Sequence, residues 1–107
     1  MTDVCAVVIT AREPGWIGTF ARELVSDRLC AGSHITSPIQ SVYRWDGQVH
    51  DVYESHVTLH TRTEHVAEIV RRTELQHAYE VPCVVATPIV GGSPAYISWI
   101  IEQTDRG

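Results

Sequence analysis

An Asp46-Gly47 pair lies between two long extended runs and constrains the fold of this chain more than any other feature. Asp-Gly is a strong hairpin signal, because both residues tolerate the positive φ that a two-residue turn requires. The two arms lie within residues 30–61. Each has roughly a dozen residues, about twice the usual strand length. Such arms extend beyond one small domain and leave backbone groups unpaired, which predicts that another copy of the chain covers them.

Strand and helix periodicities alternate in the N-terminal third. Residues 4–10 are nearly all apolar and β-branched, which is typical of a buried central strand. Residues 16–28 carry apolar side chains at helical spacing and predict an amphipathic helix that covers a sheet. In the first hairpin arm, Pro38 predicts a bulge or bend, because proline cannot donate to a strand ladder.

The C-terminal half adds two helices and a strand. Thr63 is predicted to cap a helix that ends near Leu75. A Val-Pro pair then enforces extended backbone before a fourth strand at residues 83–89. A Ser-Pro pair at Ser93 predicts the start of a short closing helix. The order β-α-β-β-α-β-α predicts an α+β, ferredoxin-like fold, with a four-stranded antiparallel sheet and both main helices on one face.

Composition limits the size of the fold and its partners. With 107 residues, of which 44% are hydrophobic, the chain can bury one core, so we expect a single domain over residues 1–107. The net charge is −5, and the one adjacent basic pair, Arg71-Arg72, lies among glutamates, so nucleic acid is not expected as a partner. The apolar run at residues 4–9 is too short for a signal-peptide core or a membrane span, which predicts a cytoplasmic protein with no membrane partner.

Motifs that would indicate catalysis are missing from the sequence. There is no nucleophile elbow, phosphate-binding loop, dinucleotide fingerprint or metallohydrolase motif. Serines and histidines occur without a spacing that implies a triad. The three cysteines, Cys5, Cys30 and Cys83, are widely spaced in apolar surroundings and are predicted to be buried free thiols. We therefore expect a protein that is not an enzyme.

The third predicted strand has one apolar and one polar face. Simple alternation puts Tyr53, Val57 and Leu59 on one side, which we assign to the helices. The other side carries Glu54, His56, Thr58 and His60 and would lie on the open sheet face, toward the axis of a trimer. His56 and His60 start about 13 Å apart, so one protomer cannot bring both to one ion. Three symmetry copies of either could meet around a metal, an anion or waters.

Five segments resemble successive motifs of the CutA family, small trimeric proteins named for divalent-cation tolerance. They are Val-Val-Ile-Thr-Ala at residues 7–11, Tyr-Arg-Trp-Asp-Gly at 43–47, His-Thr-Arg at 60–62, His-Ala-Tyr-Glu-Val-Pro at 77–82 and Tyr-Ile-Ser-Trp-Ile at 96–100. They occur in family order across nearly the whole chain. The resemblance implies a tight homotrimer in which the hairpin and the C-terminal region join the subunits.

The resemblance also implies a divalent-metal ligand set, from which this chain departs. Some family members carry a thiol at the end of the first strand and paired histidines before the Tyr-Glu-Val-Pro segment, taken as copper ligands. Here these positions read Ile9 and Gln76-His77, and Gly32 stands where a cysteine is common. His77 is therefore the one metal-ligand candidate from this set, for copper or zinc. One imidazole does not make a selective site, so no metal cofactor is required.

Aromatic side chains and one carboxylate near His77 are candidates for a ligand cleft. Aromatics with polar tips favour half-buried interfaces, so subunit packing is the ordinary role of these residues and a lined pocket is the alternative. Glu80 could instead form an ion pair or cap the strand, because a buried carboxylate must be compensated. The candidates are Tyr43, Trp45, Tyr79, Glu80, Tyr96 and Trp99.

Three functions stay open from the sequence. The first is a CutA-like trimer for divalent-cation tolerance that binds copper or another divalent cation between subunits. The second is a regulatory trimer similar to the PII signalling proteins, which bind small ligands in inter-subunit clefts; the lack of lysine and of a phosphate-binding glycine loop argues against a nucleotide, although Arg44 and Arg62 could hold an anion. The third is a structural or interaction trimer, for which the sequence offers no partner motif.

Overall fold

The fold is a four-stranded antiparallel sheet with three helices, and the computed structural model describes residues 3–107 of it. Met1 and Thr2, the start of the segment before the first strand, lie outside these residues. The strands run in the order β2-β3-β1-β4, as a ferredoxin-like arrangement requires. The elements are β1 (Val4–Ala11), α1 (Pro14–Ser26), β2 (Gly32–Trp45), β3 (Gln48–Arg62), a 3₁₀ turn (Thr63–His65), α2 (Val66–Gln76), β4 (Val84–Pro88) and α3 (Pro94–Gln103).

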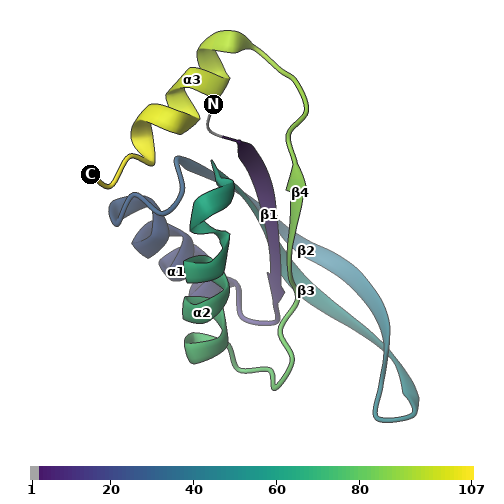
Figure 1. The fold of residues 1–107 in the computed structure, drawn as a ribbon. Coiled ribbons are helices and arrows are strands. Elements are labelled where there is room, and N and C mark those ends of the chain that lie inside the picture. Colours follow the sequence, from purple (N-terminus) through teal and green to yellow (C-terminus); the bar gives the residue numbers. More distant parts are fainter. Residues whose placement is uncertain (1–2) are drawn as a thin grey trace.

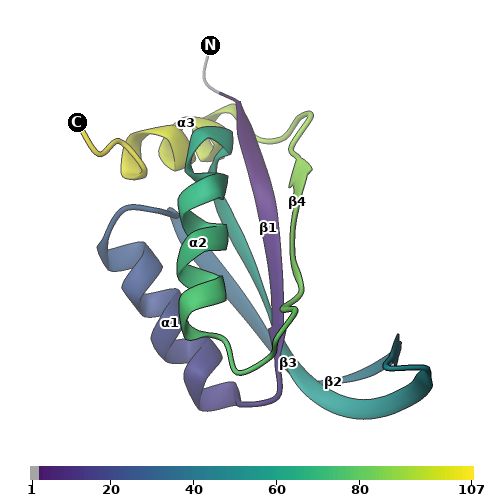
Figure 2. The same cartoon turned by 60° about the horizontal axis from the view of Figure 1, so that its bottom comes forward.

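Helices α1 and α2 lie on one face of the sheet and enclose the main core (Figures 1 and 2). Alternate residues of β1 and β3 point to these helices, and Ile9 and Leu59 are fully buried there. From α1, Phe20 and Leu24 fill the space between the layers. The predicted helix-facing set is therefore confirmed for the half of β3 that lies under the helices.

The long hairpin has the predicted turn and arms. Asp46 and Gly47 have φ values of 52° and 74°, the conformation that the tight turn needs. The arms β2 and β3 contain 14 and 15 residues, and their distal half extends away from the helices (Figure 2). The β2–β3 register shifts between Thr36 and Ile39, which confirms the bulge predicted at Pro38.

The register of β3 keeps the predicted alternation of faces, but burial departs from it at two residues. Tyr53, predicted to face the helices, is 72% exposed, whereas Glu54, predicted on the open face, is only 5% exposed. Both residues lie where the hairpin has passed the end of the helical layer, so no helix covers Tyr53. The carboxylate of Glu54 is covered instead by Tyr79, which follows α2.

Helix ends differ from the predictions in ways that the backbone explains. Helix α1 starts at Pro14, which occupies the first turn where its missing N–H costs nothing. Thr63 does not cap α2; it opens a 3₁₀ turn and no side chain caps either segment. The Ser93 cap of α3 is confirmed, because its Oγ accepts a hydrogen bond from the Tyr96 N–H at 3.4 Å.

Helix α3 closes one end of the sheet. Ile100 packs with Val4 and Ala31 in a second apolar cluster. Trp99 lies so close to Gly32 that a Cβ there would stand 3.3 Å from its ring. The sheet face opposite α1 and α2, predicted to be uncovered, is thus partly covered at this end and open along the rest. No helix among residues 3–107 is long and apolar enough to cross a membrane.

Candidate functional site

His77 ends α2 and is held through both ring nitrogens. Its Nδ1 accepts the backbone N–H of Tyr79 at 3.0 Å, so Nε2 carries the hydrogen that it donates to the carbonyl of Thr10 at 2.7 Å. The ring is 9% exposed and packs against Trp16, with centroids 5.0 Å apart. In this conformation neither nitrogen offers a free lone pair to a metal, so metal binding at His77 requires one of the two bonds to open.

The half-buried Tyr79 and the buried Glu54 form a hydrogen-bonded pair beside His77. The Tyr79 hydroxyl donates to Oε2 of Glu54 at 2.7 Å, and its ring lies 4.6 Å from that of His77. Burial, followed by the hydrogen bond to Glu54, raises the pKa of Tyr79, which therefore stays a donor at physiological pH. The sequence pattern put Glu54 on the open face, as the register has it, but did not show that Tyr79 would cover it there.

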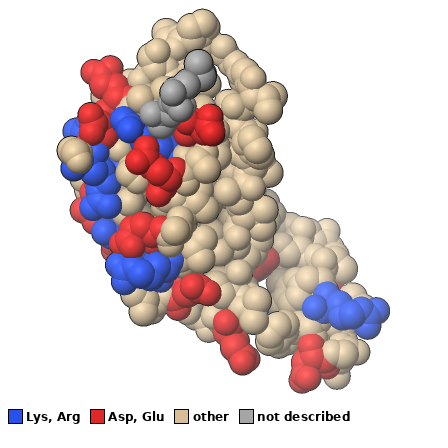
Figure 3. All heavy atoms as spheres, in the orientation of Figure 1, with Lys and Arg blue, Asp and Glu red and all other residues tan. Residues whose placement is uncertain are grey.

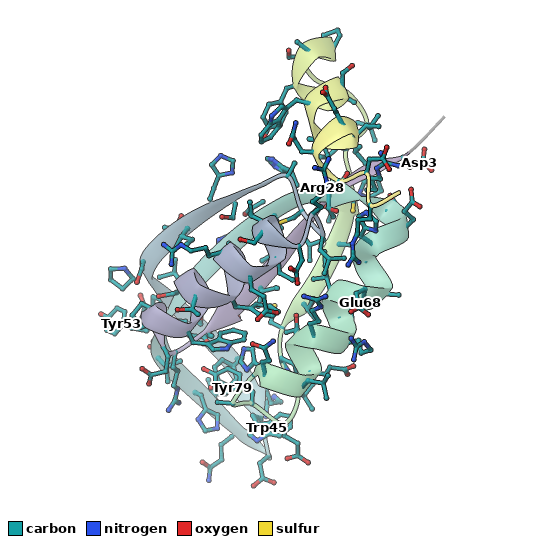
Figure 4. All side chains as sticks on the ribbon, turned by 90° about the vertical axis from the view of Figure 1, so that its left-hand side faces the viewer. Asp3, Arg28, Trp45, Tyr53, Glu68 and Tyr79 are labelled. Carbon is teal, nitrogen blue, oxygen red and sulfur yellow. The ribbon has the colours of Figure 1, made fainter. Side chains whose placement is uncertain are left out.

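A cleft of about 760 Å³ opens between the distal hairpin and the segment that follows α2. Four predicted cleft residues line it: Tyr43, Trp45, Tyr79 and Glu80. Figure 4 shows Tyr79 and Trp45 at this end of the molecule, with Tyr53 directed outward from the strand. The other two candidates, Tyr96 and Trp99, pack on each other at the opposite end of the sheet. The structure therefore divides the predicted set into two groups.

Two charged side chains complete the cleft, and the sequence prediction missed both. They are Glu54 and Arg12, which directly follows β1. The position of Arg12 at the end of that strand, where the hairpin bends away, is the sequence signal that could have indicated its place in the cleft. Interaction with the hydroxyl of Tyr43 first, and with Tyr79, raises the pKa of Arg12. Tyr43 also stacks on His50 across the hairpin, with centroids 5.3 Å apart. The cleft can thus offer a guanidinium, two phenols and flat aromatic faces to a ligand.

The open-face histidines lie apart, as the strand spacing predicts. His56 pairs with Thr10 and Thr36 in the sheet, and His60 pairs with Ala6 and Gly32 near α3. His60 Nδ1 lies 2.7 Å from the Tyr96 hydroxyl. The two predicted axial residues therefore have different surroundings: His56 lies in the open part of the sheet, whereas His60 contacts Tyr96 of α3.

The residues that could hold a metal ion are spread over the protomer. Within residues 3–107, no three His, Cys, Asp or Glu side chains converge as an ion site. The cysteines are free thiols; Cys5 and Cys30 are buried as predicted, and burial raises the pKa of Cys30 to about 12. Cys83, predicted to be buried, is exposed at the cleft, because it precedes the edge strand β4 and no element packs over it.

Comparison with known proteins gives consistent matches over nearly the whole chain. The family profile described as CutA1 divalent ion tolerance protein matches residues 5–103. The divalent-cation tolerance protein CutA of Thermus thermophilus is 35% identical over 104 residues, 97% of this chain and 99% of that protein. The chloroplastic protein CutA of Arabidopsis thaliana is 34% identical over 94% of this chain, which spans about half (54%) of that relative.

Solved structures show the same fold. CutA1 of Oryza sativa matches with a TM-score of 0.92 and 28% identity, covering 98% of this chain and 96% of that one. The T. thermophilus protein matches with a TM-score of 0.89 and 34% identity over 98% and 100%. A protein of Archaeoglobus fulgidus, described as a periplasmic divalent cation tolerance protein, matches with a TM-score of 0.89 and 30% identity over 98% and 100%.

Proposed function

Because the chain belongs to the CutA1 divalent ion tolerance family, we propose that it acts in divalent-cation tolerance as a non-catalytic homotrimer that binds a divalent cation where its subunits meet. The T. thermophilus and A. fulgidus relatives are named as tolerance proteins and not as enzymes, which supports a role in binding. The site between subunits and the ion, copper or zinc, belong to this proposal.

The main support for the proposed trimer comes from exposed apolar side chains on one face of the hairpin, which we call the apolar back of the hairpin. The β2–β3 register puts Val42, Val49 and Tyr53 on one face, and each is more than 60% exposed. This face is opposite the one that carries Tyr43 and His50. Burying each side chain would stabilise an assembly by about 1.5–3 kcal/mol. Each of the three pairs across the hairpin with a polar residue, Asp51, Arg44 or Gln40, so the face is mixed; a second copy of the chain is the expected cover for its exposed apolar side chains.

The distribution of surface charge favours one orientation of the subunits in the proposed trimer. Charged side chains gather over α1 and α2, whereas the surface over β4 is mostly uncharged (Figure 3). On β4, Val85 is more than half exposed on the face opposite the two helices. An assembly that turns the helices outward and the open sheet face inward buries the uncharged surface and leaves the charges in water.

Native mass spectrometry of the purified chain, with and without equimolar copper or zinc, tests the proposal. A trimer that retains one or three ions is the expected result. A trimer without ions would remove the cation-binding part, and a monomer would contradict the assembly. His77→Ala then tests the predicted ligand: if ion binding is lost while the trimer remains, His77 binds the ion, and if ion binding is unchanged, His77 has a structural role.

The cleft supports a second function, the binding of a small anionic ligand as in PII-like trimeric regulators. Arg12 and Arg44 line the cleft together with the Tyr43 and Tyr79 hydroxyls, and a guanidinium recognises a carboxylate or phosphate through paired hydrogen bonds. A thermal-shift screen of nucleotides and dicarboxylates would give a stabilising hit that is lost in Arg12→Gln. Failure of both the ion and the anion tests would favour the third function, a trimer that displays a surface to another protein.

The relatives are described from different cellular compartments, so the location of this protein is a separate part of the proposal. We expect this protein in the cytoplasm, whereas the A. fulgidus protein is described as periplasmic and the A. thaliana protein as chloroplastic. Fractionation of the source cells, with detection of the native protein in each fraction, tests this expectation.

A further inference from the structure

A histidine pair lies on the open sheet face, on neighbouring strands. His34 on β2 pairs in register with Thr58, and His60 on β3 pairs with Gly32, so the two histidines are diagonal neighbours on one face. Their ring centroids are 5.4 Å apart and the planes are inclined by 55°. We propose that His34 and His60 of one protomer chelate a divalent transition-metal ion.

The ring separation fits two imidazoles that share one ion. A Zn–N bond is about 2.0–2.1 Å, so an ion would lie about 3 Å from each ring centre, and two rings at a tetrahedral angle would be about 5 Å apart. The observed 5.4 Å is close to that separation. His34 is exposed on the edge strand, so its side chain can adjust to the ion. Water or another subunit would fill the remaining positions.

Tyr96 of α3 restrains the ring of His60 through a hydrogen bond. His60 Nδ1 lies 2.7 Å from the Tyr96 hydroxyl. Histidines that bind metals almost always use their second ring nitrogen in a hydrogen bond of this kind, which fixes the ring and its tautomer. In the tautomer that donates Nδ1–H to the Tyr96 oxygen, the lone pair of Nε2 is available to an ion, and the proposed chelate uses this tautomer.

The chemistry of the two imidazoles selects a class of ion. Only a neutral imidazole can donate a lone pair, and metal binding competes with protons for it. Imidazole suits copper, nickel and zinc, whereas magnesium and calcium prefer oxygen ligands. The chelate is therefore specific for a class of ion and not for divalent charge in general.

This inference rests on the proposed function for the class of ligand, but not on the trimer, because one protomer supplies both histidines. It also places the ion far from His77, at the other end of the sheet. His60 is one of the two residues that the sequence analysis assigned to the trimer axis, whereas His34 was not among its candidates. The pair therefore assigns a metal role to a face for which the sequence left a metal, an anion or waters open.

Isothermal titration of the full chain with Zn²⁺ or Ni²⁺, with Mg²⁺ as the negative control, tests the chelate. We expect about one ion per chain, and an affinity at least about tenfold weaker in His34→Gln and in His60→Gln. The double variant should be no weaker than either single one, since one lost ligand already opens the chelate. His56→Gln, on the same strand and face, is the matched control and should bind like the original chain.

A further variant and a fold measurement separate loss of the metal site from loss of the fold. Tyr96→Phe should weaken Zn²⁺ binding by about tenfold although it removes no ligand. His34→Gln changes an exposed residue, so circular dichroism should show an intact fold in that variant even if His60→Gln is destabilised. Unchanged affinity in both histidine variants, an equal loss in His56→Gln, or no Zn²⁺ binding by the original chain would each overturn the chelate. A trimer that retains ions in both variants would overturn the chelate alone, whereas a monomer that binds Zn²⁺ through His34 and His60 would overturn the trimer alone.

Discussion

The Tyr79 hydroxyl is the donor that compensates the buried carboxylate of Glu54, so its removal has a predictable cost. In Tyr79→Phe the Glu54 carboxylate stays largely buried and loses this hydrogen bond. We expect a loss of about 1–3 kcal/mol in the free energy of unfolding. Chemical denaturation measures it. Tyr53→Phe removes the same group from a side chain that is 72% exposed and should change stability by less than about 0.5 kcal/mol. Equal effects in both variants would contradict the role assigned to the Tyr79–Glu54 bond.

His60 gives the stability of the protein a pH dependence of known sign. Its pKa is lowered in the folded state by burial and by His34, below the value of about 6.5 expected for the unfolded chain. Between these values the unfolded state binds more protons, so stability rises with pH. This contribution is fully present above pH 6.5 and is lost as the pH falls through the folded pKa.

NMR titration of the histidine ring protons and denaturation at several pH values check this. The free energy of unfolding of His60→Gln should fall less than that of the original chain between pH 7.5 and pH 5. In His34→Asn the pKa of His60 should rise, because a positive neighbour is removed. A pKa of His60 at or above 6.5 in the folded chain would refute the assignment.

Among the elements, the hairpin turn depends on one glycine. Gly47 has a φ of +74°, and a Cβ added there would meet no atom within 4 Å. Gly47→Ala therefore introduces backbone strain without a clash, and we expect a loss of about 1–2 kcal/mol of stability. Gly91→Ala is the matched control, since Gly91 also has open space and lacks a positive φ. Thermal unfolding compares the two; equal stabilities would show that the turn tolerates a side chain at Gly47.

Sequence periodicity predicted the elements well where one local rule decides them. The Asp46-Gly47 turn, the bulge at Pro38 and the Ser93 cap each depend on neighbouring residues only, and all three are confirmed. Alternation gave the faces of Tyr53 and Glu54 but not their burial, which depends on where the helical layer ends and on Tyr79, which is distant in sequence.

The candidate site was predictable only in part for a similar reason. Tyr43, Trp45, Tyr79 and Glu80, four of the six cleft candidates, line one cleft. Arg12 joins them from another strand end, and Tyr96 and Trp99 lie at the far end of the sheet on α3. The packing position of α3 follows from Ile100, Val4 and Ala31, three residues far apart in the chain. No periodicity within α3 shows which end of the sheet it will cover.

The protomer as a whole has two unlike sides, and this leads to a prediction about its assembly. Its long axis measures 44 Å against 25 and 21 Å, because the hairpin extends from the helical layer with Val49 and Tyr53 uncovered. A carboxylate at position 53, opposite Gln40, would be buried in the proposed trimer without a basic partner across the hairpin, at a cost of several kcal/mol. Tyr53→Glu should therefore convert the trimer into monomers without unfolding the protomer, since Tyr53 makes little contact within it.

Light scattering coupled to size exclusion measures the mass of each variant, and circular dichroism shows whether the protomer is folded. Leu75→Glu is the matched control, because Leu75 is also 72% exposed but lies at the end of α2, on the side that the proposed trimer turns to water. It should remain a trimer. A trimeric Tyr53→Glu would show that the interface lies elsewhere. Dissociation of both variants would place the end of α2 in the interface and reverse the proposed orientation, whereas dissociation of Tyr53→Glu alone would place the apolar back of the hairpin between subunits.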